Sequence, residues 1–162
     1  MKRRKGFTLV ELMIVVCLLA FISTIGGLWL HNYTLNRNLR TAARDIASDF
    51  AIFKGRAVSD NITYQIVFNT TAPGSYTIQS VVNAVVTNLT TKSPSAFGSG
   101  IRIISATFGA GASQTIIFSP RGIVSPLGNA GGDGVVLQNT RTSQATITVN
   151  MTGRTYVTFV IV

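Results

Sequence analysis

Glu11 is the residue whose position most directly suggests chemistry. This one acid stands at the start of residues 12–30, a run of nineteen residues without a formal charge. A carboxylate is costly to place in lipid unless a cation lies close to it with good geometry. The sequence therefore indicates that Glu11 pairs with an amine, either that of its own chain or that of a neighbouring subunit.

Residues suited to catalysis or metal binding are few elsewhere. His31 is the only histidine, and Cys17 is the only cysteine, so an intrachain disulfide is excluded. Asp60 and Asp133 stand apart in loop-like contexts, whereas general acid–base catalysis needs two groups that converge in a pocket. The glycine-rich residues 128–134 are not followed by the lysine of a phosphate-binding loop. The sequence predicts a protein that is not an enzyme and that needs neither a cofactor nor a metal.

The positive charge of the chain is unevenly distributed. The net charge is +9, and four of the fourteen cations are Lys2, Arg3, Arg4 and Lys5. Cations at the start of a membrane segment favour a cytoplasmic N-terminus. The remaining ten cations against five acids make the rest of the chain only mildly basic, which weakens a general inference of nucleic-acid binding.

The apolar run is long enough to cross a bilayer as a helix, which takes about 20 residues. An ordinary secretory signal peptide fits less well, because the run is too long and no small-residue cleavage site ends it. A plain signal anchor would explain the span but not Gly6, Phe7 and Glu11.

Helical periodicity continues beyond the apolar run. Apolar residues recur every three or four positions on one face, with charged residues on the others. No proline or glycine interrupts residues 28–54, and Gly55 is a plausible stop. We expect one helix from Phe7 to about Gly55, whose second half lies on a globular head. The apolar positions are Leu35, Leu39, Ala42, Ile46, Phe50 and Phe53.

From residue 61 the apolar pattern changes to period two, which is typical of strands. Residues 83–100 are rich in threonine, serine and asparagine and are expected to form mainly a loop. About seven strands are predicted, at residues 62–68, 76–82, 101–107, 114–118, 135–139, 145–150 and 154–162. The predicted fold class is α+β, with a long N-terminal helix packed on an antiparallel β head.

The N-terminus resembles the class III leader of type IV pilins and type II secretion pseudopilins. The residues that carry this resemblance are Lys5-Gly6-Phe7-Thr8-Leu9-Val10-Glu11 and the apolar run behind them. The resemblance implies that a membrane prepilin peptidase cuts after Gly6 and methylates the new N-terminus, so that Phe7 becomes N-methylphenylalanine. It also implies that Glu11 is kept and is needed for assembly. Methylation preserves the positive charge of the amine, so an ion pair with Glu11 remains possible.

The C-terminal half is similar to the GspH/FimT branch of these proteins, the H-type minor pseudopilins and their pilus relatives. The similar segments are Ile117-Phe118-Ser119-Pro120-Arg121-Gly122, Gly134-Val135-Val136-Leu137, Ile147-Thr148-Val149 and Gly153-Arg154. The resemblance implies a pilin-like fold. It also implies four parts: a cleaved leader (residues 1–6), the transmembrane half of the helix (7–30), its amphipathic half (31–56) and a periplasmic β-rich head (57–162).

The expected function is that of a minor pseudopilin of a type II secretion system. Such a subunit lies at or near the tip of a short periplasmic pseudopilus and is involved in protein secretion. The expected location is the bacterial inner membrane, crossed once, with the N-terminus cytoplasmic before cleavage and the head in the periplasm. The expected partners are the prepilin peptidase, other pseudopilins or minor pilins of the filament, the membrane itself and secreted proteins.

Two alternatives remain open at this point. A FimT-like minor pilin active in DNA uptake would use head arginines, of which Arg121, Arg141 and Arg154 are the candidates for nucleic-acid contact. Some FimT-like pilins end in a basic tail, whereas here Arg154 is followed by an apolar strand. A major pilin is the other alternative. Many major pilins carry a disulfide in the head, and this head has no cysteine.

Overall fold

The computed structural model describes residues 7–128 and 133–162, and for residues 24–32 it describes the backbone alone. The predicted leader, residues 1–6, lies outside the described residues. The chain forms two compact units, residues 1–34 and 35–162. Each unit is considered by itself below.

Helix α1 runs from Leu9 to Asp60. The predicted apolar stripe is confirmed: of its six positions, Leu39 to Phe53 are all buried, and Leu35 is half-buried. The predicted end at Gly55 is wrong, because α1 continues for five more residues. Gly55 faces open space, whereas Ala57 is fully buried, so packing of the following turn keeps the chain helical. Asn61, with a φ of 54°, then ends the helix in a left-handed conformation.

The first sheet has five antiparallel strands in the order β3-β2-β1-β5-β6. Strands β1 and β2 form the predicted hairpin, with Asn69 opposite Ser75. Strand β5 pairs with the other edge of β1. The bounds are β1 Thr63–Asn69, β2 Ser75–Val82, β3 Val85–Lys92, β5 Thr115–Phe118 and β6 Val124–Ser125.

Strand β3 corrects the sequence analysis, which assigned residues 83–100 mainly to a loop. Asn83 and Ala84 both have positive φ angles, 50° and 64°. Such a pair forms a tight turn that matches the twist of a hairpin. The segment therefore pairs back on β2, and a short 3-10 helix, η1 (Pro94–Phe97), follows it.

The second sheet has four antiparallel strands in the order β4-β7-β8-β9. Its strands are β4 Arg102–Thr107, β7 Gly134–Gln138, β8 Gln144–Val149 and β9 Thr155–Val160. All four were predicted to within one or two residues of their bounds. The described part of the head thus has nine strands in two sheets, where the sequence indicated about seven in one antiparallel head.

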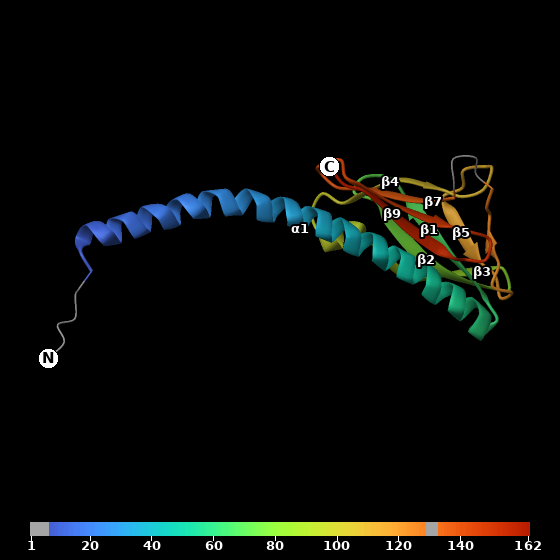
Figure 1. The fold of residues 1–162 in the computed structure, drawn as a ribbon. Coiled ribbons are helices and arrows are strands. Elements are labelled where there is room, and N and C mark those ends of the chain that lie inside the picture. Colours follow the sequence, from blue (N-terminus) through green and yellow to red (C-terminus); the bar gives the residue numbers. More distant parts are fainter. Residues whose placement is uncertain (1–6, 129–132) are drawn as a thin grey trace. The chain divides into compact units, whose positions relative to one another are not determined.

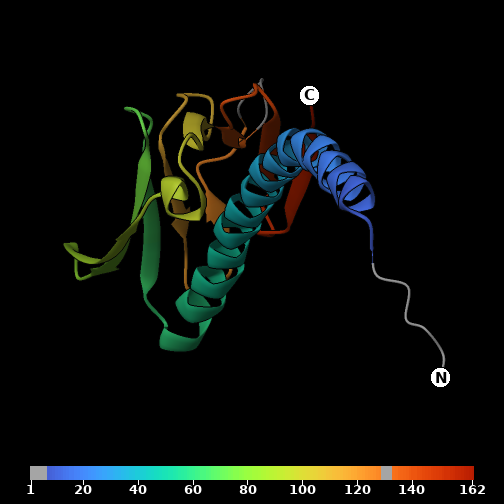
Figure 2. The same ribbon diagram turned by 90° about the vertical axis from the view of Figure 1, so that its left-hand side faces the viewer.

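Residues 35–60 of α1 lie against the buried faces of both sheets and join them into one core (Figure 1; Figure 2). The ring of Phe50 lies 6.1 Å from that of Phe68 and 5.9 Å from that of Phe118. On the second sheet, Val135, Leu137 and Ile147 belong to the same cluster. Burial of a side chain of this size stabilises a fold by about 1.5–3 kcal/mol. The packing of α1 against both sheets therefore contributes to the stability of the head.

Gly134 shows why one glycine of the similar C-terminal segments is needed. It starts β7 opposite Thr148 of β8. A Cβ atom at this position would lie 2.1 Å from the carbonyl oxygen of Ile147, a backbone atom that cannot rotate away. The glycine therefore permits the close approach of β7 to β8.

Candidate functional site

The N-terminus of α1 is where the sequence places the processing and assembly residues. Gly6 lies outside the described residues. Phe7 precedes the helix, and its side chain is 80% exposed. Glu11 lies in the first helical turn and is exposed. The structure therefore leaves Phe7 and Glu11 accessible at the same end of the helix.

Thr8 and Glu11 form a capping box that the sequence analysis missed. The backbone amide of Glu11 donates to Oγ1 of Thr8 over 3.2 Å. In return, the backbone amide of Thr8 donates to Oε2 of Glu11 over 3.3 Å. This reciprocal pairing satisfies two amides that a helix start would otherwise leave free. The pattern threonine-x-x-glutamate before an apolar run could have revealed it. Glu11 is thus held in place at the start of the helix before any partner arrives.

Replacing Thr8 with valine should weaken this cap by about 1 kcal/mol. We expect the amides of residues 9–12 to exchange with solvent about fivefold faster in the full chain in detergent micelles, since local opening becomes easier. Thr8→Ser, which keeps the hydroxyl, is the matched control. Equal exchange rates in the valine and serine variants would show that the box does not stabilise the helix start.

The side chains behind Glu11 present an unbroken apolar surface. All residues from 12 to 23 are exposed, among them Leu12, Leu19 and Phe21 at 59–68%. Within the described residues, no helix contains a stretch long and apolar enough to cross a membrane. The predicted span, residues 7–30, extends into residues 24–32, whose side chains are not described.

The three candidate arginines do not lie together. Arg121 and Arg154 belong to neighbouring turns, because Val124 donates to the carbonyl of Met151 over 3.2 Å and the Lys54 side chain lies against both Gly122 and Gly153. Arg141 lies in the turn between β7 and β8, at the opposite end of β8. At about 3.3 Å per residue, the six residues of β8 separate the two ends by roughly 20 Å.

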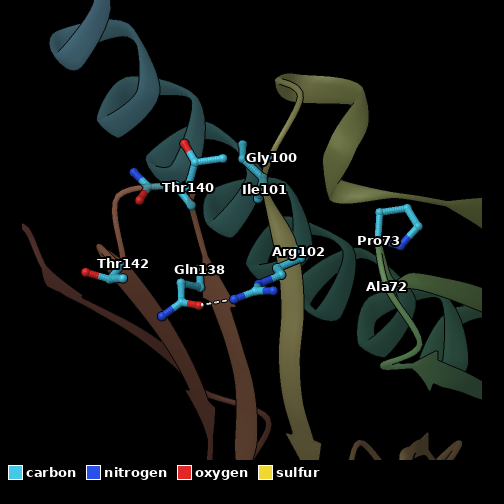
Figure 3. A pocket seen from close by; sticks show the side chains of 9 residues that line it. Ala72, Pro73, Gly100, Ile101, Arg102, Gln138, Thr140 and Thr142 are labelled. Carbon is cyan, nitrogen blue, oxygen red and sulfur yellow. Dashed lines mark hydrogen bonds between the residues drawn. The ribbon is translucent and has the colours of Figure 1, made fainter.

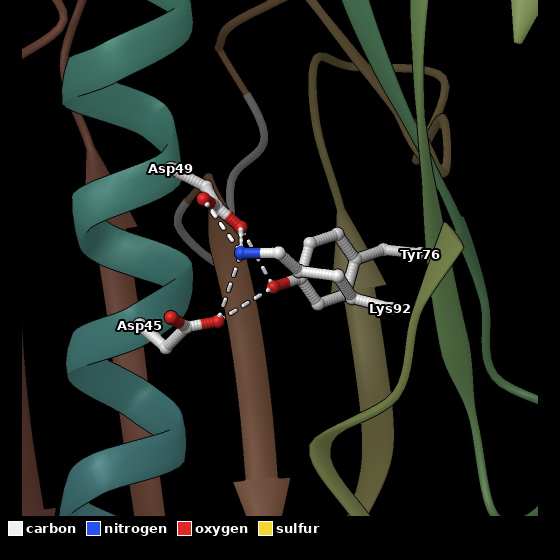
Figure 4. A network of polar contacts seen from close by, with 4 residues as sticks. All are labelled: Asp45, Asp49, Tyr76 and Lys92. Carbon is white, nitrogen blue, oxygen red and sulfur yellow. Dashed lines mark hydrogen bonds and ion pairs between the residues drawn. The ribbon is translucent and has the colours of Figure 1, made fainter. Parts of the chain in front are cut away.

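A polar network that the sequence analysis missed joins α1 to the first sheet (Figure 4). Asp49 is only 4% exposed. The sequence analysis had placed the charged residues of this helix on the faces away from its buried apolar stripe. The Lys92 ammonium donates to both carboxylate oxygens of Asp49, over 2.9 and 2.8 Å, and to Asp45 over 3.3 Å. The Tyr76 hydroxyl donates to Asp49 over 2.8 Å and to Asp45 over 3.1 Å. Lys92 was assigned to a loop, so its approach to the helix could not be foreseen.

The network raises the pKa values of two of its side chains, Tyr76 and Lys92. Burial, followed by the hydrogen bond to Asp49, raises the pKa of the Tyr76 hydroxyl well above its usual value. Burial alone would lower the pKa of the Lys92 ammonium, but the hydrogen bonds and negative charges of Asp49 and Asp45 outweigh it and raise the pKa. A raised pKa stabilises the fold below the unfolded-state value, and this stabilisation is lost as the pH rises beyond it.

We therefore expect the stability of the head to change little from pH 7 to about 10 and to fall above it. The measurement is the melting temperature of the full chain between pH 7 and 12. The Tyr76→Phe variant should show a smaller alkaline loss. Tyr64, whose pKa is also raised by its hydrogen bond to Asp60, is unchanged in this variant, so the difference reports on Tyr76. A melting temperature that falls equally in both proteins would contradict the assignment.

A cleft of about 570 Å³ opens beside the first residues of β4 (Figure 3). Ala72 and Pro73 form one side, and Thr140 and Thr142 lie across from them. The Arg102 guanidinium donates to Oε1 of Gln138 over 2.8 Å within this cleft. The lining combines apolar and hydroxyl groups with one cation, and it brings no pair of titratable groups together.

The isolated acids of the head serve the fold. Asp60 accepts hydrogen bonds from the hydroxyls of Tyr64 and Ser59, over 2.7 and 2.9 Å. Asp133 accepts from the backbone amides of Gly109 and Gly128, each over 2.7 Å. Among the described residues, no group of three histidine, cysteine or acidic side chains could hold a metal ion.

Comparison with known proteins gives matches along most of the sequence. Residues 1–27 match the family model described as the prokaryotic N-terminal methylation motif. Residues 42–153 match the model described as type II transport protein GspH. No curated protein matches the sequence. Among solved structures, the fold is similar to that of the minor pseudopilin EpsH from the type 2 secretion system of Vibrio cholerae. The TM-score is 0.59 at 10% identity, over 75% of this chain and 97% of that one. The predicted pilin-like fold is thereby confirmed.

Proposed function

The chain belongs to the type II transport protein GspH family, and we propose that it is a minor pseudopilin of a type II secretion system. It acts as a structural subunit, and not as an enzyme, at or near the tip of a short periplasmic pseudopilus involved in protein secretion. The observation that carries the proposal is the presence of a GspH-type head and a methylation motif in one chain. The exposed apolar surface behind Glu11 supports it, because a filament subunit needs a surface on which its neighbours pack.

Processing is the first step of this role. The prepilin peptidase cuts after Gly6 and methylates Phe7, which removes the four leader cations and creates a cationic amine four residues before Glu11. The capping box supports this proposal, since it holds the Glu11 carboxylate on the backbone amide of Thr8, the residue that follows Phe7.

The chain is anchored in the inner membrane through residues 7–30, with its head in the periplasm. The uncharged run 12–30 and the cations before it support this orientation. Residues 31–56 then carry the amphipathic half of the helix, and residues 57–162 the rest of the head. Other pseudopilins of the filament and secreted proteins are its proposed partners.

A strain that lacks this chain tests the proposed function. We expect substrates of the type II system to accumulate in the periplasm, and the full chain supplied in trans to restore their release. Normal secretion together with a loss of pilus-dependent DNA uptake would instead favour the alternative of a FimT-like minor pilin.

The DNA-uptake alternative has one observation in its favour. Lys54, Arg121 and Arg154 gather at one end of the head, and DNA binding needs several cations on one surface. Arg141 lies apart from them, so the cluster is smaller than the sequence suggested. A gel-shift assay of the full chain with duplex DNA at two salt concentrations separates the cases. Absence of a shift at low salt would contradict DNA binding. A salt-sensitive shift that the Arg121→Ala variant weakens would support it.

A further inference from the structure

Strand β3 leaves one side of the first sheet open. It is the end strand in the sheet order, and among the described residues it pairs only with β2 (Figure 2). Every residue from Val85 to Thr91 is exposed, on both faces of the strand. A strand in this position offers unpaired backbone donors and acceptors along its outer side.

The usual devices that protect such an edge are scarce in β3. Natural edge strands commonly carry charged residues or proline, which prevent another strand from pairing. Residues 81–91 contain neither, and Val85, Val86 and Leu89 are 64%, 50% and 46% exposed. A register shift opposite Ile78 and Gln79 leaves Leu89 as a bulge. The regular open edge is therefore Val85 to Asn88.

The two end strands of the second sheet, β4 and β9, differ from β3. Strand β9 begins next to Arg154, whose guanidinium lies over the ring of Tyr156, 5.7 Å from its centre. A cation of this kind at an edge disfavours the addition of another strand. Strand β4, the other end strand of the second sheet, begins at Arg102. The one cation of β3 is Lys92 at its last position, and its ammonium is paired with Asp45 and Asp49 of α1.

A row of side-chain amides crosses the first sheet and ends at this open edge. Gln65 donates through Nε2 to Oε1 of Gln79 over 2.6 Å. Gln79 in turn donates through Nε2 to Oδ1 of Asn88 over 2.7 Å. The amide nitrogen of Asn88 is the last donor of the row and makes no further hydrogen bond within the described residues. Polarisation along such a chain strengthens its terminal donor, so the edge favours a hydrogen-bond acceptor opposite Asn88.

The charge of the head indicates which kind of strand this edge accepts. Residues 35–162 contain ten lysine and arginine residues against four aspartates, a net charge of +6. A second copy of the head would carry the same positive charge and be repelled, whereas an acidic polypeptide would be attracted.

We propose that the open edge of β3 binds an extended, acidic segment of a different polypeptide as an added strand. Backbone hydrogen bonds along Val85 to Asn88 supply the affinity, and an acceptor side chain opposite Asn88 sets the register. The proposal rests on the sheet edge and on the charge of the head, and it does not depend on the proposed place of the chain in a filament.

The test measures binding of a fluorescent peptide to the full chain in detergent micelles by fluorescence anisotropy. The probe is an eight-residue peptide of alternating valine and glutamate, and the comparison peptide has lysine in place of glutamate. We expect saturable binding of the acidic peptide, at least tenfold tighter than that of the basic one. Equal affinity for the two peptides, or no binding of either, would overturn the proposal.

Two variants locate the binding site. Asn88→Asp keeps the acceptor for Gln79 but replaces the terminal donor with a negative charge, so the acidic peptide should bind at least tenfold more weakly. Val86→Lys places a charge on the edge, which disfavours an added strand and should weaken binding of the acidic peptide. The matched control is Val58→Lys, which adds the same charge at a helix position of similar exposure and should leave binding unchanged. Unchanged binding in Asn88→Asp and Val86→Lys, with unchanged melting temperatures, would overturn the proposal. So would a dimer of the unmodified chain in sedimentation that Val86→Lys dissociates, because the occupant would then be a second copy.

Discussion

Replacing Glu11 with valine is expected to leave the chain processed and membrane-bound but to lower its cross-linking to partner subunits by more than tenfold. The physical reason is the cost of a carboxylate in lipid, which is several kcal/mol unless a cation pairs with it. That cost drives Glu11 toward the amine of a neighbouring subunit. Without the carboxylate, the subunit remains stable in the membrane and loses the contact that favours assembly.

The Glu11→Gln variant removes the negative charge of Glu11 and keeps its role in the capping box with Thr8. Glutamine can replace glutamate in a capping box, because its side-chain oxygen still accepts from the Thr8 amide. We expect Glu11→Gln to assemble as poorly as Glu11→Val while keeping slow amide exchange at residues 9–12. Undiminished cross-linking in Glu11→Val would refute the assembly role. Normal assembly of Glu11→Gln would show that the cap, and not the charge, is what assembly needs.

Replacing Asp49 with alanine is expected to destabilise the head by about 2 kcal/mol, because the buried Tyr76 hydroxyl loses its closer hydrogen-bond partner. Asp49 is the better buried of the two aspartates in the network, with its side chain 6% exposed against 30% for Asp45. Its loss leaves the Tyr76 hydroxyl and the Lys92 ammonium dependent on Asp45 alone. The measurement is urea unfolding of the full chain, followed by the tyrosine circular dichroism signal.

Asp45→Ala is the matched control for Asp49→Ala. The Asp45 side chain is 30% exposed, and it lies 3.3 Å from the Lys92 ammonium. Partly exposed pairs of this kind contribute at most about 1 kcal/mol, and Asp49 would still hold both partners. Equal losses of stability in the two variants would contradict the assignment of Asp49 as the centre of the network.

The parts of the fold that follow from local patterns were predicted from the sequence. The buried stripe of α1 and the strands β4, β5, β7, β8 and β9 appear directly in the spacing of apolar residues, whereas the two-residue strand β6 was missed. Strand β3 was missed because its threonines and asparagine have loop-like composition, and because the turn at Asn83 and Ala84 lacks the usual glycine. The division into two sheets depends on pairings between distant strands, such as β1 with β5, which no local pattern encodes.

For the candidate site, the sequence likewise indicated some residues and missed others. The positions of Phe7 and Glu11 follow from the leader pattern, and the capping box could have been read from Thr8 and Glu11. The burial of Asp49 could not be foreseen, because it depends on a lysine 43 residues away. The separation of Arg141 from Arg121 likewise required the register of β7 and β8.

The composition of the filament tests the central proposal most directly. Filaments recovered from cells that express the type II system can be analysed by quantitative mass spectrometry for this chain and for the main subunit. We predict that the chain is present, cleaved after Gly6 and methylated on Phe7, in a small fraction of the amount of the main subunit. Its absence from filaments that contain the other subunits, or its presence as the most abundant one, would contradict the role of a minor pseudopilin.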